Sequence, residues 1–115
     1  MAALGEVVGL NGVHLAGPVQ AALPYATVAI TEERDWGHKN GAGRELRLVV
    51  SLRDGGESDA RVRVLGDAAE AAVGAIGGTI AGWQMVSCAL LRGRVARDGR
   101  GWLAVREFRV RMLAA

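Results

Sequence analysis

The fold is decided by the stretch Gly82–Leu113, GWQMVSCALLRGRVARDGRGWLAVREFRVRML, which contains two long strand-like runs. The first extends from Gly82 to Arg97 and the second from Gly101 to Leu113, with Asp98-Gly99-Arg100 between them. Asp-Gly between alternating apolar and polar residues is a strong signal for a tight turn joining antiparallel strands. The sequence therefore predicts a long C-terminal β-hairpin.

The second run of the hairpin also indicates which of its sides is buried. Alternate residues form one mainly apolar face, made of Trp102, Ala104, Arg106, Phe108, Val110 and Met112. The opposite face carries Leu103, Val105, Glu107, Arg109 and Arg111. This alternation is typical of an antiparallel sheet that packs on one side only.

Further strands are predicted upstream of the hairpin. Val13–Leu15 is a brief strand that stops at Gly17-Pro18, and Pro24–Ile30 (PYATVAI) is a better one, rich in β-branched residues. Glu45–Leu52 (ELRLVVSL) alternates with period two, as a half-buried strand does. The polar, glycine-containing segment between these strands, Glu32–Gly43, is predicted to be a long mobile loop.

One principal helix is predicted from about Ala60 to Ile76, capped by Ser58 or Asp59 and stopped by Gly77-Gly78. Its apolar stripe consists of Val62, Leu65, Ala69, Ala72, Val73 and Ile76. The segment Met1–Leu10 is expected to form one or two helical turns or a frayed strand. The fold class that follows is α+β: a single domain over 1–115, with an antiparallel sheet of about four strands, one helix on one face and the long hairpin.

Composition limits the size of the core and the kinds of protein this can be. The chain has 115 residues, half of them hydrophobic, so it is expected to fold rather than remain disordered. Only five residues are aromatic and 17 are glycine, which predicts a thin core of small and β-branched side chains. The single cysteine, Cys88, excludes an intrachain disulfide framework and a cysteine-based zinc site.

The same sequence predicts a soluble protein made in a cytoplasm. The N-terminal stretch has no basic residue before its apolar part and contains Glu6, which argues against a signal peptide. No window approaches the roughly 18 apolar residues that a membrane span needs.

No enzyme signature is present. His14 and His38 lie on different elements in no metal-binding spacing, and Cys88 lies within an alternating strand, where a small core residue is the expected role. The glycine-rich loop around Lys39 lacks the phosphate-binding pattern of a P-loop. We therefore expect no catalytic residues, no cofactor and no metal.

The arginines are the better indication of function. Seven of the thirteen lie in the hairpin, and they include Arg92 and Arg94 on one side of the first strand and Arg109 and Arg111 on one side of the second. Such a stripe suits phosphates or the acidic residues of a neighbouring subunit. Because the net charge is only +2, the subunit interface is favoured. A small nucleic-acid-binding or protein-interaction module that uses the Arg-rich hairpin stays as the alternative.

Several of these segments together resemble one family. The first are the strand Pro24–Ile30, the pair Asp35-Trp36, and Lys39 with the glycines before Arg44-Glu45. They are followed by the strand from Glu45 to Leu52, the Ala-rich helix, and Gly82-Trp83 with the arginine-rich hairpin. In this order they resemble the small tail-completion, or tail-terminator, proteins of long-tailed bacteriophages and gene transfer agents, from about Val13 to Leu113. The chain differs at its front, because the family opens with a longer amphipathic helix than Met1–Leu10 can form.

The resemblance implies a structural, non-enzymatic role. Proteins of this family form a six-fold ring that caps the head-proximal end of the tail tube, stops its growth and docks the head connector. The implied partners are further copies of the chain in a homo-hexamer, the tail tube protein, the head connector or stopper protein, and DNA that passes through the lumen without sequence-specific contact. The implied location is the particle, after assembly in the bacterial cytoplasm, with no membrane involved.

The resemblance and the charge pattern together give a hypothesis for the contact residues. The positive hairpin face is expected to meet a negative patch of a neighbour, formed by Glu32, Glu33 and Asp35. The loop Trp36–Arg44 is expected to contact a neighbour or the tube, with Trp36 as an anchor or, alternatively, packed back on its own sheet. The complete candidate set is Glu32, Glu33, Asp35, Trp36, His38, Lys39, Arg44, Arg92, Arg94, Arg109 and Arg111.

Overall fold

Six strands and one helix make up the part of the chain that the computed structural model describes, residues 13–15 and 22–115. The elements are β1 (Val13–Leu15), β2 (Tyr25–Asp35), β3 (Gly43–Asp54), α2 (Ala60–Gly74), β4 (Thr79–Ile80), β5 (Trp83–Asp98) and β6 (Gly101–Ala114). The expectations for Met1–Leu10 and for the stop at Gly17-Pro18 lie outside the described residues.

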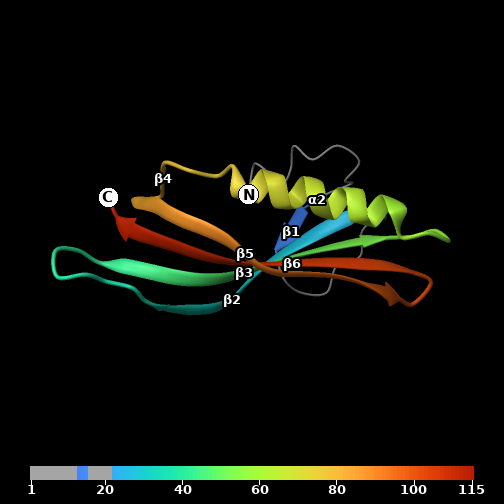
Figure 1. Cartoon of the computed structure of the whole chain (residues 1–115), viewed down its shortest axis with the longest axis horizontal. Coiled ribbons are helices and arrows are strands. Elements are labelled where there is room, and N and C mark those ends of the chain that lie inside the picture. The colour runs from blue at the N-terminus through green and yellow to red at the C-terminus, as the bar shows by residue number, and fades with distance from the viewer. Residues whose placement is uncertain (1–12, 16–21) are drawn as a thin grey trace.

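All six strands form one sheet in the order β1-β2-β3-β6-β5-β4. The four long strands in its middle are antiparallel to their neighbours, β1 is parallel to β2, and β4 adds two residues beside β5. The helix lies across one face of this sheet, and the β5–β6 hairpin turns at the end opposite the β2–β3 connection (Figure 1). The predicted α+β fold, with its helix and C-terminal hairpin, is confirmed. The brief strand predicted at Val13–Leu15 is β1, and the two-residue β4 is an addition.

The core lies between α2 and the middle of the sheet. Directly opposite residues of antiparallel strands point to the same face, so Leu48 beside Phe108, and Leu52 beside Ala104, present one apolar surface to the helix. The helix contributes Val62, Leu65, Ala69 and Val73, all at most 4% exposed. The predicted stripe of the helix and the predicted apolar face of β6 are therefore the two halves of one core.

One charged residue belongs to that core face. The Arg106 side chain is only 10% exposed; its Nη1 donates to the Val105 carbonyl at 3.2 Å, and its Nη2 donates to Asp67 of α2 at 3.2 Å. Its Nε lies 3.3 Å from Glu70 of the same helix. The buried charge is therefore compensated by two helix carboxylates that reach it from the solvent side.

Two glycines make room for this arginine. A Cβ on Gly66 of α2 would lie 2.8 Å from Arg106 Nη2, and one on Gly93 of β5 would lie 3.0 Å from its Cδ. Because either methyl group would displace a side chain that is held at several points, the helix packs closely here only through glycine.

The predicted loop Glu32–Gly43 is wrong over its first four residues, which belong to β2. Glu32 pairs with Arg47, and Arg34 pairs with Glu45, so charged cross-strand pairs continue the strand where apolar alternation ends. The connection that remains is residues 36–42, closed by the bond from the Trp36 N–H to the Gly43 carbonyl at 3.0 Å.

The helix boundaries also differ slightly from the prediction. Asp59 is the N-cap residue, but its carboxylate accepts a bond from Arg63 Nε at 2.8 Å, so it does not cap the helix. Ser58 Oγ accepts the Ala60 N–H at 3.1 Å in its place. The helix ends at Gly74, two residues before the predicted Ile76, whose N–H bonds to Val73 in a tighter final turn.

The molecule is long and narrow, 53 × 23 × 22 Å. A helix of 15 residues is about 22 Å long and therefore covers only part of strands that reach 16 residues. Its first turn lies beside Asp54, the last residue of β3, so the covered part is the one near the hairpin turn. The end of the sheet at the β2–β3 connection extends far past the helix (Figure 1).

The turn of the hairpin lies against the end of β3 closely enough to give a stability test. A Cβ on Gly101 would lie 2.2 Å from the Asp54 carbonyl oxygen, which is backbone and cannot rotate away. We predict that Gly101→Ala lowers the free energy of unfolding by about 2 kcal/mol or more, measured by chemical denaturation. Gly41→Ala is the matched control, because nothing lies within 4 Å of its added methyl group. Equal stability of the two variants would contradict this packing.

Candidate functional site

The face of the sheet opposite α2, here called the far face, is predominantly charged. Its cross-strand neighbours form two rows, Arg34–Glu45–Arg111 and Glu32–Arg47–Arg109, each spanning β2, β3 and β6. A third pair, Glu107 and Arg92, joins β6 to β5. The strand register thus gathers acidic and basic side chains that are up to 79 positions apart in the chain (Glu32 to Arg111).

Glu45 is the centre of this network. It is 17% exposed, accepts a bond from Arg111 Nε at 2.8 Å and lies 3.6 Å from Arg34 Nε. Glu32 bonds to Arg34 and lies 4.0 Å from Arg47, and the Arg34 hydrogen bond lowers the pKa of Glu32. Of the acidic patch predicted to meet a neighbour, Glu32 and Glu33 are therefore already paired with arginines of their own chain.

Arg109 is the exception in the row. It stands directly opposite Arg47, a like charge, and its Nε is buried with no hydrogen-bond partner among the described residues. Like charges placed opposite each other on a sheet destabilise it. This position therefore carries an excess of positive charge that an added carboxylate would relieve.

The β2–β3 connection forms an aromatic and cationic cluster at one end of the sheet. The Arg111 guanidinium lies 5.3 Å from the centre of the Trp36 ring, and His38 packs edge-on against the same ring at 4.6 Å. Arg44 pairs with Glu33 at 3.3 Å and lies 5.9 Å from the ring centre of Trp83. Within the chain the Trp36 ring thus lies against Arg111 of β6, and its role as an anchor for a neighbour stays a prediction.

The other contacts of this connection are between residues that are close in sequence. The Asp35 carboxylate accepts the Gly37 N–H at 2.9 Å, and Lys39 is exposed in the loop. A Cβ on Gly43 would lie 2.3 Å from the Trp36 carbonyl oxygen, so the loop closes only with glycine there.

The structure brings most of the predicted contact residues together, and the others lie apart from them. Arg92 and Arg94 lie toward the hairpin turn; Arg92 is 4.0 Å from Glu107, and Arg94 is exposed. Sequence reasoning missed Glu45, Arg47 and Glu107, because only the register shows which charges are neighbours. The signal available was the polar side of Glu45–Leu52, on which Glu45 and Arg47 alternate with apolar residues.

The residues considered for catalysis are not assembled. His14 belongs to β1 and His38 to the loop, while Cys88 packs against the core and burial raises the pKa of its thiol. Cys88 is thus the core residue that the strand pattern predicts. Within residues 13–15 and 22–115, no three His, Cys, Asp or Glu side chains group as metal ligands, and no helix there is long and apolar enough to cross a membrane.

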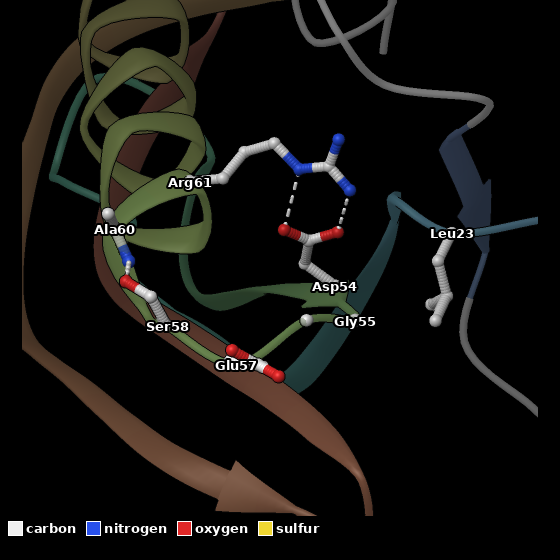
Figure 2. A pocket seen from close by; sticks show the side chains of 8 residues that line it. Leu23, Asp54, Gly55, Glu57, Ser58, Ala60 and Arg61 are labelled. Carbon is white, nitrogen blue, oxygen red and sulfur yellow. Dashed lines mark hydrogen bonds and ion pairs between the residues drawn. The ribbon is translucent and has the colours of Figure 1, made fainter.

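The depression beside the start of α2 is occupied by a closed ion pair (Figure 2). Arg61 Nε donates to Asp54 Oδ2 at 2.7 Å, and its Nη2 bonds to the other carboxylate oxygen. The Asp54 side chain is 1% exposed, and Leu23 lies on the far side of the depression. Because each charge has its partner, this pair ties the end of β3 to the helix.

The Asp54–Arg61 pair predicts a specific pH dependence of stability. The Arg61 hydrogen bond lowers the pKa of Asp54, so the folded protein binds fewer protons here than the unfolded chain does. The stabilisation is present at neutral pH and is lost as pH falls from about 5 through the lowered pKa. In denaturation series we expect stability to fall more steeply below about pH 5 for the native chain than for Asp54→Asn. Parallel curves would contradict the pairing.

Comparison with known proteins relates this architecture to the tails of phage-like particles. The model of the family described as "Tail completion protein gp17" matches residues 1–114. No curated protein sequence matches the chain. Among solved structures, it is similar to a chain of "Virion of native gene transfer agent (GTA) particle", with a TM-score of 0.71 and 23% identity over 99% of this chain and 87% of that one.

Proposed function

Since the chain belongs to the tail completion protein gp17 family and is thus a structural protein of a phage-type tail, we propose that it forms the ring that ends the tail tube. The ring caps the head-proximal end of the tube, stops its growth and joins the tail to the head connector. In this role the protein acts by binding and performs no catalysis.

The observation that carries the proposal is the family match, which spans 1–114. The fold supports it, because a chain in a gene transfer agent virion has the same architecture. A long, narrow sheet with uncovered ends also suits a subunit whose remaining surface is covered by neighbours, as in cyclic head-to-tail assemblies.

The candidate contact residues are not equally available to a neighbouring protein. Arg111 already holds Glu45 and lies over Trp36, so its charge is largely used within the chain. Arg109 and the exposed Arg94 are the cations best placed to receive carboxylates of a neighbouring copy or of the tail tube protein. The end formed by Trp36, His38 and Lys39 is the proposed contact with the tube or the head connector.

DNA is proposed to pass through the lumen without sequence-specific contact. Arg92, Arg106 and Arg111 of the hairpin each have a carboxylate partner in the chain, which leaves little of their charge for phosphates. A nucleic-acid-binding module is therefore less well supported than the structural role.

Deletion of the gene in a particle-producing strain tests the proposal. Negative-stain microscopy is expected to show capsids without tails beside unattached tubes of uncontrolled length, because nothing ends the tube or joins it to the head. A plasmid copy of the gene should restore complete particles, and a copy with an early stop codon is the matched control. Normal tailed particles from the deletion strain would overturn the proposal.

A further inference from the structure

Two strands of the sheet have long edges that no described residue covers. β1 pairs only with residues 26–28 of β2, so residues 29–35, here called the β2 edge, have no neighbour on their outer side among the described residues. β4 pairs only with Trp83 and Gln84 of β5, and one further bond joins Met85 N–H to the Gly78 carbonyl. Residues 86–98 of β5 therefore have no neighbour on their outer side among the described residues; 86–91 are here called the β5 edge.

The two edges lie at the same level of the sheet. The register runs from Ile30 through Leu48 and Phe108 to Leu90, and directly opposite residues share a face. Ile30 and Leu90 are 59% and 44% exposed, although both point to the face that bears α2. Both strands also have a register shift at this level, between Ile30 and Glu32 and between Leu90 and Arg92. The edges thus match in position, in shape and in having an exposed apolar side chain.

The β5 edge lacks the usual protection of an exposed strand. Natural edges carry lysine, proline or inward charges that prevent pairing with another chain. From Met85 to Leu91 the sequence is MVSCALL, without a charge or a proline, and Val86 and Leu91 are 49% and 40% exposed. Such an edge exposes apolar surface and unpaired backbone groups in a monomer, and a strand that covered it would satisfy both.

Level and direction identify the covering strand as one from another copy. The two edges are level with each other, and each exposes one apolar side chain there, Ile30 on β2 and Leu90 on β5. β2 and β5 run in opposite directions, because the sheet has four long antiparallel strands from one to the other. A rotation about an axis along the strands keeps their direction, so β5 of one copy would meet β2 of the next in antiparallel orientation.

We propose that the β5 edge of each copy pairs with the β2 edge of the next, so that one antiparallel sheet continues from subunit to subunit. Ile30 then packs on Leu90 of the neighbour, and the contact is head-to-tail, which closes into a ring instead of a two-fold dimer. This inference deepens the proposed function, because it states how the ring of that proposal is joined.

Disulfide trapping tests the pairing directly. The variant carries Ile30→Cys and Leu90→Cys in a Cys88→Ala background, so that each copy has one cysteine on each edge. Within one chain these positions are three strand spacings apart, about 14 Å, which is beyond the roughly 7 Å that a disulfide spans between Cα atoms. Any disulfide is therefore between copies. Both positions are exposed, so the substitutions are expected to be tolerated by the fold.

The expected result is a ladder of trimers and larger species on non-reducing gels after mild oxidation. Each single-cysteine variant should stop at dimers, and Val64→Cys with Leu90→Cys is the matched control, because Val64 is 65% exposed but lies on the helix. The oxidation is carried out on the purified protein and on particles from the producing strain, so that a ring formed only on the tail is also examined.

Absence of the ladder in both samples, or the same ladder from the Val64→Cys control, would overturn the edge pairing. The microscopy of the deletion strain separates this failure from failure of the proposed function. Tailless capsids without a ladder would mean that the protein ends the tube but that its copies are joined through another surface. Normal tailed particles would reject the proposed function itself.

Discussion

The rest of this structure depends on a mismatch of length between one helix and the sheet that it covers. Helix α2 has 15 residues, about 22 Å, whereas β5 has 16 residues and spans about 50 Å. The apolar core is therefore confined to the part of the sheet under the helix, where the buried side chains of α2 meet Leu52 and Phe108. Outside that region the helix does not cover the strands. At the β2–β3 end, charged cross-strand pairs hold the strands together instead.

Arginine has two distinct roles in this arrangement, set by which face of β6 it occupies. Arg106 points to the helix and is buried between Gly66 and Gly93, where two carboxylates of α2 compensate its charge. Arg109 and Arg111, an odd number of positions away, point to the far face. There Arg111 is paired, whereas Arg109 Nε has no partner among the described residues. The same residue type thus serves once in the core, once in a cross-strand ion pair and once as a cation whose Nε is unsatisfied there.

Local patterns predicted most of the fold because each element carried its own signal. The alternation of Glu45–Leu52, the Asp-Gly turn and the helical stripe were sufficient for β3, the hairpin and α2. The extension of β2 through Asp35 was missed because its four polar residues are strand-like only beside Arg47 and Glu45, which are distant in sequence. The candidate residues could be named from the sequence, but their pairing could not, since partners such as Glu45 and Arg111 are 66 positions apart.

The division between core and ends also separates stability from assembly. Exposed ion pairs contribute on the order of 0–1 kcal/mol each to stability. The charged pairs of the far face therefore favour the observed strand register more than they stabilise the folded protein. Stability therefore resides beneath α2, in side chains such as Val50 and Val62 that are fully buried. The ends and edges are then free to vary in charge and exposure with little effect on folding. A subunit built in this way is able to remain folded alone while its strand edges stay available to a neighbour, which is what the proposed role of joining the tail to the head requires.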